Sequence, residues 1–226
     1  MTETGATGAP PYHAQWESPE LIAEFLSGRR SAATDPRWAE SGARTPQEYE
    51  FWSSRTCGMA CLRSILDHRE GASPATVTLA HEVLLAGGYT MREGGVRGLV
   101  YRPFVDYLER RWAIRAEVAA RLPAPELAAA LAAGSWALAS VHRSIRHHDE
   151  PGPGAPPQRG GHLVLAYGLS DGAVLFHNPS GHRPATRARV RLGLDAFAGY
   201  FAERAVLLPQ FAPASRIGRL SPGRQA

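Results

Sequence analysis

The chain contains two cysteines, Cys57 and Cys61, and a cysteine thiol can serve as a nucleophile. Because they lie four residues apart on an expected helix, they are poorly placed for a disulfide bond. Apolar positions from Cys57 to Leu66 recur at helical spacing, which puts Cys57 at a helix N-terminus and Cys61 one turn later on the apolar face. A helix N-terminus stabilises a thiolate and so lowers the thiol pKa. We therefore expect Cys57 to be a reactive thiolate and Cys61 to be a core residue.

A catalytic thiol needs a histidine base, and an Asn or Asp that orients the imidazole. His162 opens the apolar run LVLAYGL directly after two glycines, and Asn178 ends the run VLFHNPSG. The turn signal Ser-Asp-Gly at 170–172 joins these runs. In such a hairpin the start of the first strand lies beside the end of the second. The sequence therefore predicts that His162 transfers the proton and that Asn178 orients it.

The strings RTCGMACLRSIL, GGHLVLAYGL and VLFHNPSG together resemble papain-like cysteine peptidases of the bacteriocin-processing, double-glycine leader peptidase type. The resemblance covers roughly residues 51–208. It implies a papain-like fold and a triad of Cys57, His162 and Asn178. It also implies processing of a peptide through an acyl-enzyme.

The donors that stabilise the oxyanion are where this chain departs from that family. The family carries a Gln five or six residues before its nucleophile, whereas this chain has Phe51 and Trp52 there. The backbone N–H of Cys57 remains available, and losing one donor can slow such a reaction about a hundredfold to a thousandfold. Gly58 leaves room for a substrate backbone beside the thiol. The side chains that we consider as the second donor are those of Trp52, Ser53, Ser54 and Arg55.

Hydrophobic periodicity predicts the elements that must position these residues. Helices are expected over 57–68, 75–86, about 99–108, 124–133 and 195–201. Strands are expected over 113–119, 136–141, 162–169, 173–177, 190–192 and 204–208. Helices first and then mostly antiparallel strands predict an α+β fold of papain-like type. Its N-terminal helical half carries the nucleophile at a helix N-terminus, packed on a C-terminal, mostly antiparallel sheet.

Three regions are expected along the chain. Residues 1–48 form an N-terminal extension that is partly disordered, 49–209 form the papain-like cysteine peptidase domain, and 210–226 form a disordered tail. Within the domain, residues 142–160 contain four prolines and no apolar period. We expect a long loop there, and long loops in compact domains are usually functional or disordered.

Composition argues against several other classes of function. The formal charge is +4 and the pI is near 9.4, but the basic residues are all Arg and are spread along the chain, so we expect no nucleic-acid partner. No run approaches the ~18 apolar residues of a membrane span and no signal peptide is evident, so we expect a cytoplasmic protein without a membrane partner. Nine histidines are present without H-E-x-x-H or C-x-x-C spacing, and we expect no metal and no cofactor.

The leading hypothesis is a papain-like cysteine peptidase or amidase that cleaves a peptide or amide through a Cys57 acyl-enzyme. Its substrate would be a peptide or acyl compound, such as a biosynthetic precursor peptide or a carrier-bound acyl group. The same triad would serve an acyltransferase or peptide ligase if an amine captured the acyl group. A third hypothesis, motivated by the missing Gln, is a catalytically inactive papain-like binding module. The sequence does not indicate the oligomeric state.

Overall fold

The computed structural model describes residues 8–92, 95–150 and 160–209 of the 226-residue chain. The expected tail at 210–226 and most of the proline-rich stretch, residues 151–159, lie outside the described residues. None of the helices in the described part combines the length and hydropathy needed to cross a bilayer.

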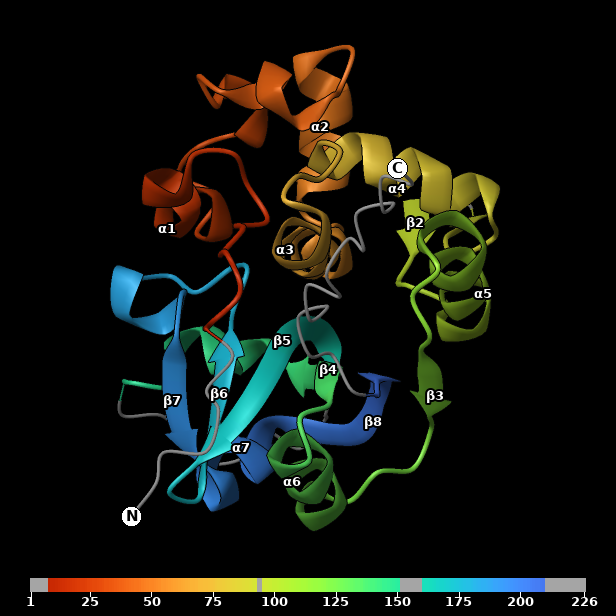
Figure 1. Ribbon diagram of the computed structural model, residues 1–226. Helices are drawn as coiled ribbons and strands as arrows, with labels where there is room; N and C mark the ends of the chain where they lie inside the picture. The colour runs from red at the N-terminus through yellow and green to blue at the C-terminus, as the bar shows by residue number, and fades with distance from the viewer. Residues whose placement is uncertain (1–7, 93–94, 151–159, 210–226) are drawn as a thin grey trace, which may run out of the picture.

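The first half of the chain is helical, as the sequence predicts (Figure 1). Its α-helices are α1 (Ile22–Leu26), α2 (Pro46–Ser53), α3 (Cys57–Glu70), α4 (Thr76–Leu85) and α5 (Tyr101–Trp112). Short 3-10 helices precede α2: η1 (Pro19–Leu21), η2 (Ala32–Thr34) and η3 (Trp38–Ser41). A two-stranded sheet between α4 and α5, formed by β1 (Thr90–Arg92) and β2 (Gly95–Arg97), was not predicted from this glycine-rich stretch.

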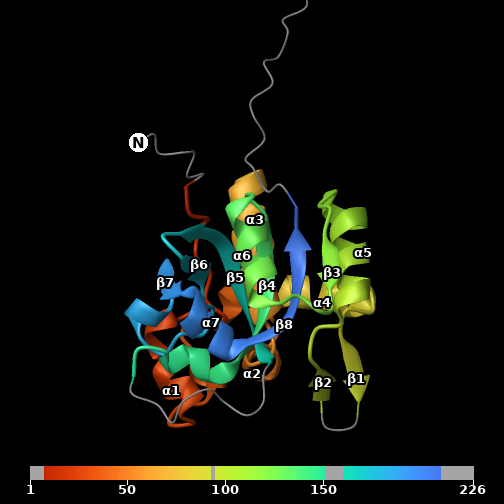
Figure 2. The ribbon, with the colours of Figure 1, turned by 90° about the horizontal axis from the view of Figure 1, so that it is seen from below.

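The second half builds a six-stranded antiparallel sheet in the order β3-β8-β4-β5-β6-β7, which confirms the α+β class. The strands β3 and β7 lie at its two edges (Figure 2). The strands are β3 (Glu117–Ala119), β4 (Trp136–His142), β5 (Gly161–Ser170), β6 (Ala173–His177), β7 (Val190–Gly193) and β8 (Phe201–Leu208). The remaining helices are α6 (Ala124–Ala132), η4 (Arg143–His147), η5 (Pro184–Thr186) and α7 (Leu194–Tyr200).

The central strand β4 is apolar on both sides because both faces of the sheet are covered. Trp136 and Leu138 belong to the core that includes α3, α4 and α5. The alternating residues Ala137 and Ala139 belong to a second core, together with Leu127 of α6 and residues of α7. Alternate side chains of β4 thus pack into different cores on the two faces of the sheet. The sheet is the middle layer between these cores.

The predicted hairpin of β5 and β6 is confirmed. Ser170 pairs with Ala173 across a two-residue turn in which Asp171 and Gly172 have φ of 46° and 70°. Asp-Gly suits such a turn because both positions need positive φ. The pairing brings the start of β5 beside the residues that follow β6, which are the places of His162 and Asn178.

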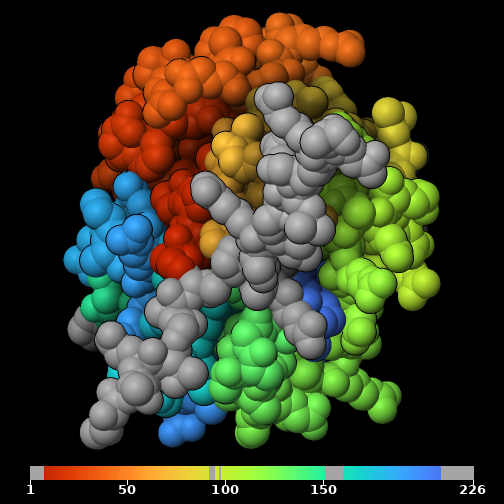
Figure 3. All heavy atoms as spheres, viewed as in Figure 1, coloured from red at the N-terminus to blue at the C-terminus, as the bar shows by residue number. Residues whose placement is uncertain are grey.

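The start of the chain is more firmly attached than its composition suggests. Trp16 and Ile22 are buried in the same core as α3, and α2 spans the boundary expected at residue 48. The main-chain N–H of Gln15 donates to the carbonyl of Pro179 at 2.8 Å. Figure 3 shows this red segment against the light-blue segment that follows β6. Residues 8–48 therefore contribute to the core and to the support of the sheet.

Candidate active site

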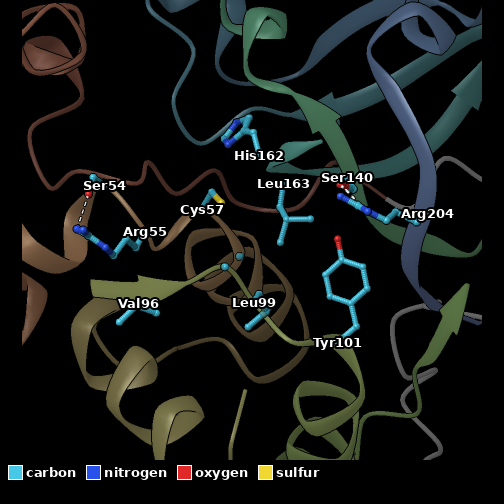
Figure 4. Close-up of a pocket in the computed structure, with 13 residues that line it drawn as sticks. Ser54, Arg55, Cys57, Val96, Leu99, Tyr101, Ser140, His162, Leu163 and Arg204 are labelled. Atoms are coloured by element: carbon cyan, nitrogen blue, oxygen red, sulfur yellow. Dashed lines mark hydrogen bonds between the residues drawn. The ribbon is translucent and has the colours of Figure 1, made fainter. Parts of the chain in front are cut away.

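A cavity of about 310 Å³ opens where the start of α3 faces the start of β5 (Figure 4). Cys57 is the first residue of α3, as the sequence predicts, and His162 is the second residue of β5. Both line the cavity. The wall beside them is apolar and is formed by Gly58, Leu99 and Leu163.

Asn178 lies next to His162, and its hydrogen bonds reveal which way its amide points. The main-chain N–H of Ser180 donates to Asn178 Oδ1 at 3.2 Å. Because an N–H can only donate, the atom that faces it must be the oxygen. The same oxygen lies 2.8 Å from His162 Nε2, so Nε2 must carry the proton and donate it to Asn178.

This tautomer leaves His162 Nδ1 with a free lone pair. Nδ1 is buried and has no hydrogen-bond partner among the described residues. His162 and Cys57 line the same cavity, and Nδ1 is the imidazole nitrogen that the hydrogen bond to Asn178 leaves unprotonated. The fold therefore brings together a thiol, an imidazole and an amide, contributed by α3, β5 and the segment after β6.

The pKa of the Cys57 thiol differs from what the sequence predicts. Cys57 reaches solvent through the cavity, yet protein surrounds it closely, and burial raises the pKa of its thiol. Backbone N–H groups of Leu163 and of the helix start, together with Arg146, favour the thiolate but do not reverse the direction. The expectation of a thiolate with a lowered pKa is therefore wrong, because desolvation outweighs the helix N-terminus.

The pKa of His162 is lowered, so its imidazole is neutral at neutral pH, as the thiol of Cys57 is. Burial first, and then the positive charge of Arg146, lower its pKa to about 3, and the hydrogen bond to Asn178 opposes this only partly. At neutral pH the resting site therefore holds a neutral thiol and a neutral imidazole.

The start of α3 leaves its own N–H groups available. Thr56 occupies the N-cap position, but its side chain accepts no capping hydrogen bond and instead donates to the carbonyl of Ser53. The first N–H groups of a helix need a partner from outside the helix. Those of Cys57 and Gly58 interact with the thiol and partly oppose the rise that burial causes in the pKa of Cys57. This cluster of donors is where an anion at the reaction centre would be stabilised.

Three of the five residues considered beside Cys57 line the cavity, namely Ser54, Arg55 and Gly58. Trp52 is buried against Tyr89 and Phe51, and its ring does not reach the cavity lining. Ser53 is buried as well, and its hydroxyl donates to the carbonyl of Glu50.

The N-terminal segment supports the site in a way that sequence reasoning missed. The Gln15 side chain donates from Nε2 to the carbonyl of Ser53 at 2.7 Å, four residues before the nucleophile. The Tyr12 hydroxyl donates to the carbonyl of Asn178 at 3.3 Å. The segment thus bridges the residues before α3 and the turn that carries Asn178. A lone Gln and a lone Tyr in a polar segment give no sequence signal of this role.

Arg146 and Ser180 extend the site behind His162. Arg146 Nε donates to Ser180 Oγ at 2.8 Å, and Ser180 Oγ lies 3.2 Å from His162 Nε2. Ser180 stands two residues after Asn178 in the string VLFHNPSG, and Arg146 lies in the stretch expected to be a functional loop. Here that stretch begins with η4, which contradicts the expectation of an irregular loop over all of 142–160.

One described cluster has the side chains that a metal ion requires. His147, Glu150 and His182 offer ligand atoms that lie within 4.8 Å of one another. Glu150 contacts His182 Nε2 at 2.7 Å and His147 Nδ1 at 3.3 Å, and Arg183 lies 3.8 Å from the same carboxylate. The guanidinium already supplies positive charge there. These residues are not part of the cavity lining.

Comparison with known proteins gives one kind of match. A scan of protein-family models and a search of curated proteins found no match to the chain. Among solved structures, the chain is similar to the peptidase domain of Streptococcus ComA, a bi-functional ABC transporter involved in a quorum-sensing pathway. The sequences are 17% identical, the TM-score is 0.43, and the match covers 70% of this chain and 93% of that chain.

Proposed function

We propose that this chain is a papain-like cysteine peptidase or amidase, in which Cys57 forms an acyl-enzyme with a peptide or amide. The observation that carries the proposal is the arrangement around His162. Its Nε2 donates to an amide oxygen of fixed orientation, which leaves Nδ1 as the acceptor nitrogen, and His162 and Cys57 line the same cavity. A nucleophile, a base and an orienting group are the three parts that such chemistry requires.

The proposed reaction begins from the neutral pair. Cys57 Sγ attacks the substrate carbonyl carbon while its proton moves to His162 Nδ1. The resulting imidazolium donates to Asn178 through Nε2–H and gives its new proton to the leaving amine as the C–N bond breaks. Water then attacks the thioester, Nδ1 accepts a proton from that water, and the thiol leaves with the proton returned by the imidazolium. The acid is released and the resting site is restored.

The negative charge that develops on the carbonyl oxygen needs donors fixed in advance. We assign this role first to the backbone N–H groups at the start of α3, because no side chain caps them. Arg55 is the cation beside them in the cavity, and its guanidinium is held by the carbonyl of Phe51 and by Ser54 Oγ at 2.9 Å. These donors would replace the Gln that double-glycine leader peptidases carry before their nucleophile.

The proposal is tested by trapping the acyl-enzyme. The protein is mixed with an activated acyl ester and quenched in acid, and the peptide containing Cys57 is examined by mass spectrometry. We expect the acyl mass on Cys57 in the native chain and its loss in Cys57→Ala and in His162→Ala. Acylation at Cys61, or an equal yield without His162, would refute the mechanism.

The fate of the acyl group separates the related hypotheses. Release of the free acid indicates a hydrolase, whereas an amide formed with an added amine indicates an acyltransferase or ligase. Alkylation of Cys57 without acylation by any ester indicates a binding module that has lost turnover.

A further inference from the structure

The cavity continues from the thiol to a polar end that the proposed mechanism does not use. Tyr101 opens α5, Ser140 lies on β4 and Arg204 on β8, and all three line this end. Arg204 Nε donates to Ser140 Oγ at 3.3 Å, and the Tyr101 hydroxyl contacts both groups. Figure 4 shows Tyr101 Oη directed toward Ser140 and Arg204, on the far side of Leu163 from Cys57. Three distant parts of the chain thus direct polar groups to one place.

The charge of this cavity has one sign. Arg55 and Arg204 line it, and none of its described lining residues is Asp or Glu. Arg204 forms no ion pair with a carboxylate among the described residues, whereas Arg102, Arg183 and Arg191 each pair with an aspartate. An arginine that faces a cavity without a carboxylate partner is available to bind an anion.

The hydroxyls of Tyr101 and Ser140, which lie beside Arg204, can also bind an anion. Burial raises the pKa of Tyr101, so its hydroxyl keeps its proton at neutral pH and can donate. Ser140 is 2% exposed, whereas Arg204 beside it is exposed, so the guanidinium can be reached by a ligand from solvent. One planar guanidinium with two hydroxyls matches the two oxygens of a carboxylate.

The passage between the thiol and this polar end depends on a glycine. A Cβ on Gly58 would lie 3.1 Å from Leu99 Cδ2 and 3.2 Å from Leu163 Cδ1. Gly58 therefore keeps space between the two leucines that form the apolar wall. A short hydrocarbon chain would lie along this wall with a polar group at its end.

We propose that the end of the cavity formed by Tyr101, Ser140 and Arg204 binds a carboxylate carried by the acyl part of the substrate. The substrate class is then an acidic peptide or a dicarboxylic acyl compound, cleaved at the carbonyl that reaches Cys57. This inference rests on the proposed function, because it names the substrate of the same site.

A pair of esters that differ in one charge tests the inference. The para-nitrophenyl half-ester of glutaric acid carries a free carboxylate, and the para-nitrophenyl ester of glutaric acid monoamide is its neutral match. We expect kcat/KM for acylation to favour the acid by about tenfold after correction for the rates with free cysteine, because a charge-assisted contact is stronger than a neutral one. Arg204→Gln should bring this ratio to about one.

The control variant is Arg102→Gln, which removes the same charge from the residue next to Tyr101. Arg102 is exposed and pairs with Asp106, so this variant should keep the native preference for the acid. If circular dichroism shows that Arg204→Gln does not fold, Tyr101→Phe removes one donor and should reduce the ratio severalfold. An unchanged ratio in a folded Arg204→Gln, or a native ratio near one, would overturn the inference.

A binding measurement separates failure of this inference from failure of the proposed function. Glutarate and glutaramide are titrated into Cys57→Ala, which cannot react, and chemical shifts are followed by NMR. We expect glutarate to bind at least tenfold more tightly than glutaramide, and Arg204→Gln to abolish that difference. If neither ester acylates the native chain but this difference is present, the carboxylate site stands and the peptidase proposal fails. If acylation occurs and glutarate shows no preference, the carboxylate site fails alone.

Discussion

Asn178 Oδ1 lies 2.8 Å from His162 Nε2, and this contact determines which nitrogen of the imidazole carries the proton. The amide cannot be flipped without placing its NH₂ group against the N–H of Ser180. Nε2 is therefore the donor and Nδ1 the acceptor. Asn178, the residue directly after β6, is 0% exposed.

Replacing Asn178 should separate its effect on the orientation of the His162 imidazole from its effect on the pKa of His162. Asn178→Ala should lower the acylation rate by roughly tenfold to a hundredfold, part of the ~10²–10⁴ that a positioned base contributes. Asn178→Asp should retain more activity, since a carboxylate also accepts from Nε2–H, and it should raise the pKa of His162. Stopped-flow acylation measures the rates. An equal loss in both variants would mean that hydrogen-bond acceptance is not the role of Asn178.

The double variant Cys57→Ala with His162→Ala should be little worse than either single variant. Groups that act as one unit lose their effect together, so their losses do not multiply. Single-turnover acylation with the same activated ester measures this, and circular dichroism checks the fold. Multiplicative losses would show that the two residues act independently.

The two cysteines should differ in reaction with iodoacetamide at every pH. Burial raises the pKa of both thiols, that of Cys61 much further, and Cys61 is 1% exposed. Alkylation of Cys57 should therefore rise with pH through and beyond the ordinary thiol pKa of about 8.5. Peptide mapping by mass spectrometry measures both sites. A rate for Cys57 that is already constant from about pH 5 to pH 7 would instead indicate a thiolate–imidazolium pair.

His162 should make the protein less stable in acid. Its pKa is about 3 when folded, against an ordinary value of 6.5, so below pH 6.5 the unfolded chain binds a proton that the folded chain does not. Its contribution is present above pH 6.5 and is lost as pH falls toward 3. The loss reaches roughly 3 kcal/mol near pH 4.

Urea unfolding of the native chain and of His162→Gln at pH 7 and pH 4 measures this contribution. The pKa values of His13, His68, His148 and His177 are also lowered, so the native curve alone mixes several groups. The difference between the two proteins isolates His162. A difference independent of pH would contradict the lowered pKa.

Gly181→Ala should damage the turn that carries Asn178. A Cβ at this position would lie 2.1 Å from the carbonyl oxygen of Thr186, so the backbone would have to move. We expect a loss of about 1–3 kcal/mol in unfolding free energy, together with slower acylation. Gly193→Ala is the control, because a Cβ there meets nothing within 4 Å. Thermal unfolding and acylation rates compare the two, and equal effects would count against a special role of this turn.

The local parts of the site could be predicted from residue pattern alone. Helical spacing after Cys57 located the start of α3, and alternation with an Asp-Gly turn located the β5–β6 hairpin. Hairpin pairing then brought His162 beside Asn178, although the two are 16 residues apart. These features follow from short-range rules of backbone geometry, which a single sequence carries.

The electrostatics of the site and the far side of the cavity follow from how the folded elements pack together. The pKa of Cys57 is raised because protein from several elements displaces water around the thiol, and the helix start cannot offset that cost. Gln15 reaches Ser53, and Arg204 meets Ser140, through contacts that span 38 and 64 residues. Such contacts depend on how the layers pack. No periodicity along the chain encodes them, because burial and through-space charge are properties of the folded whole.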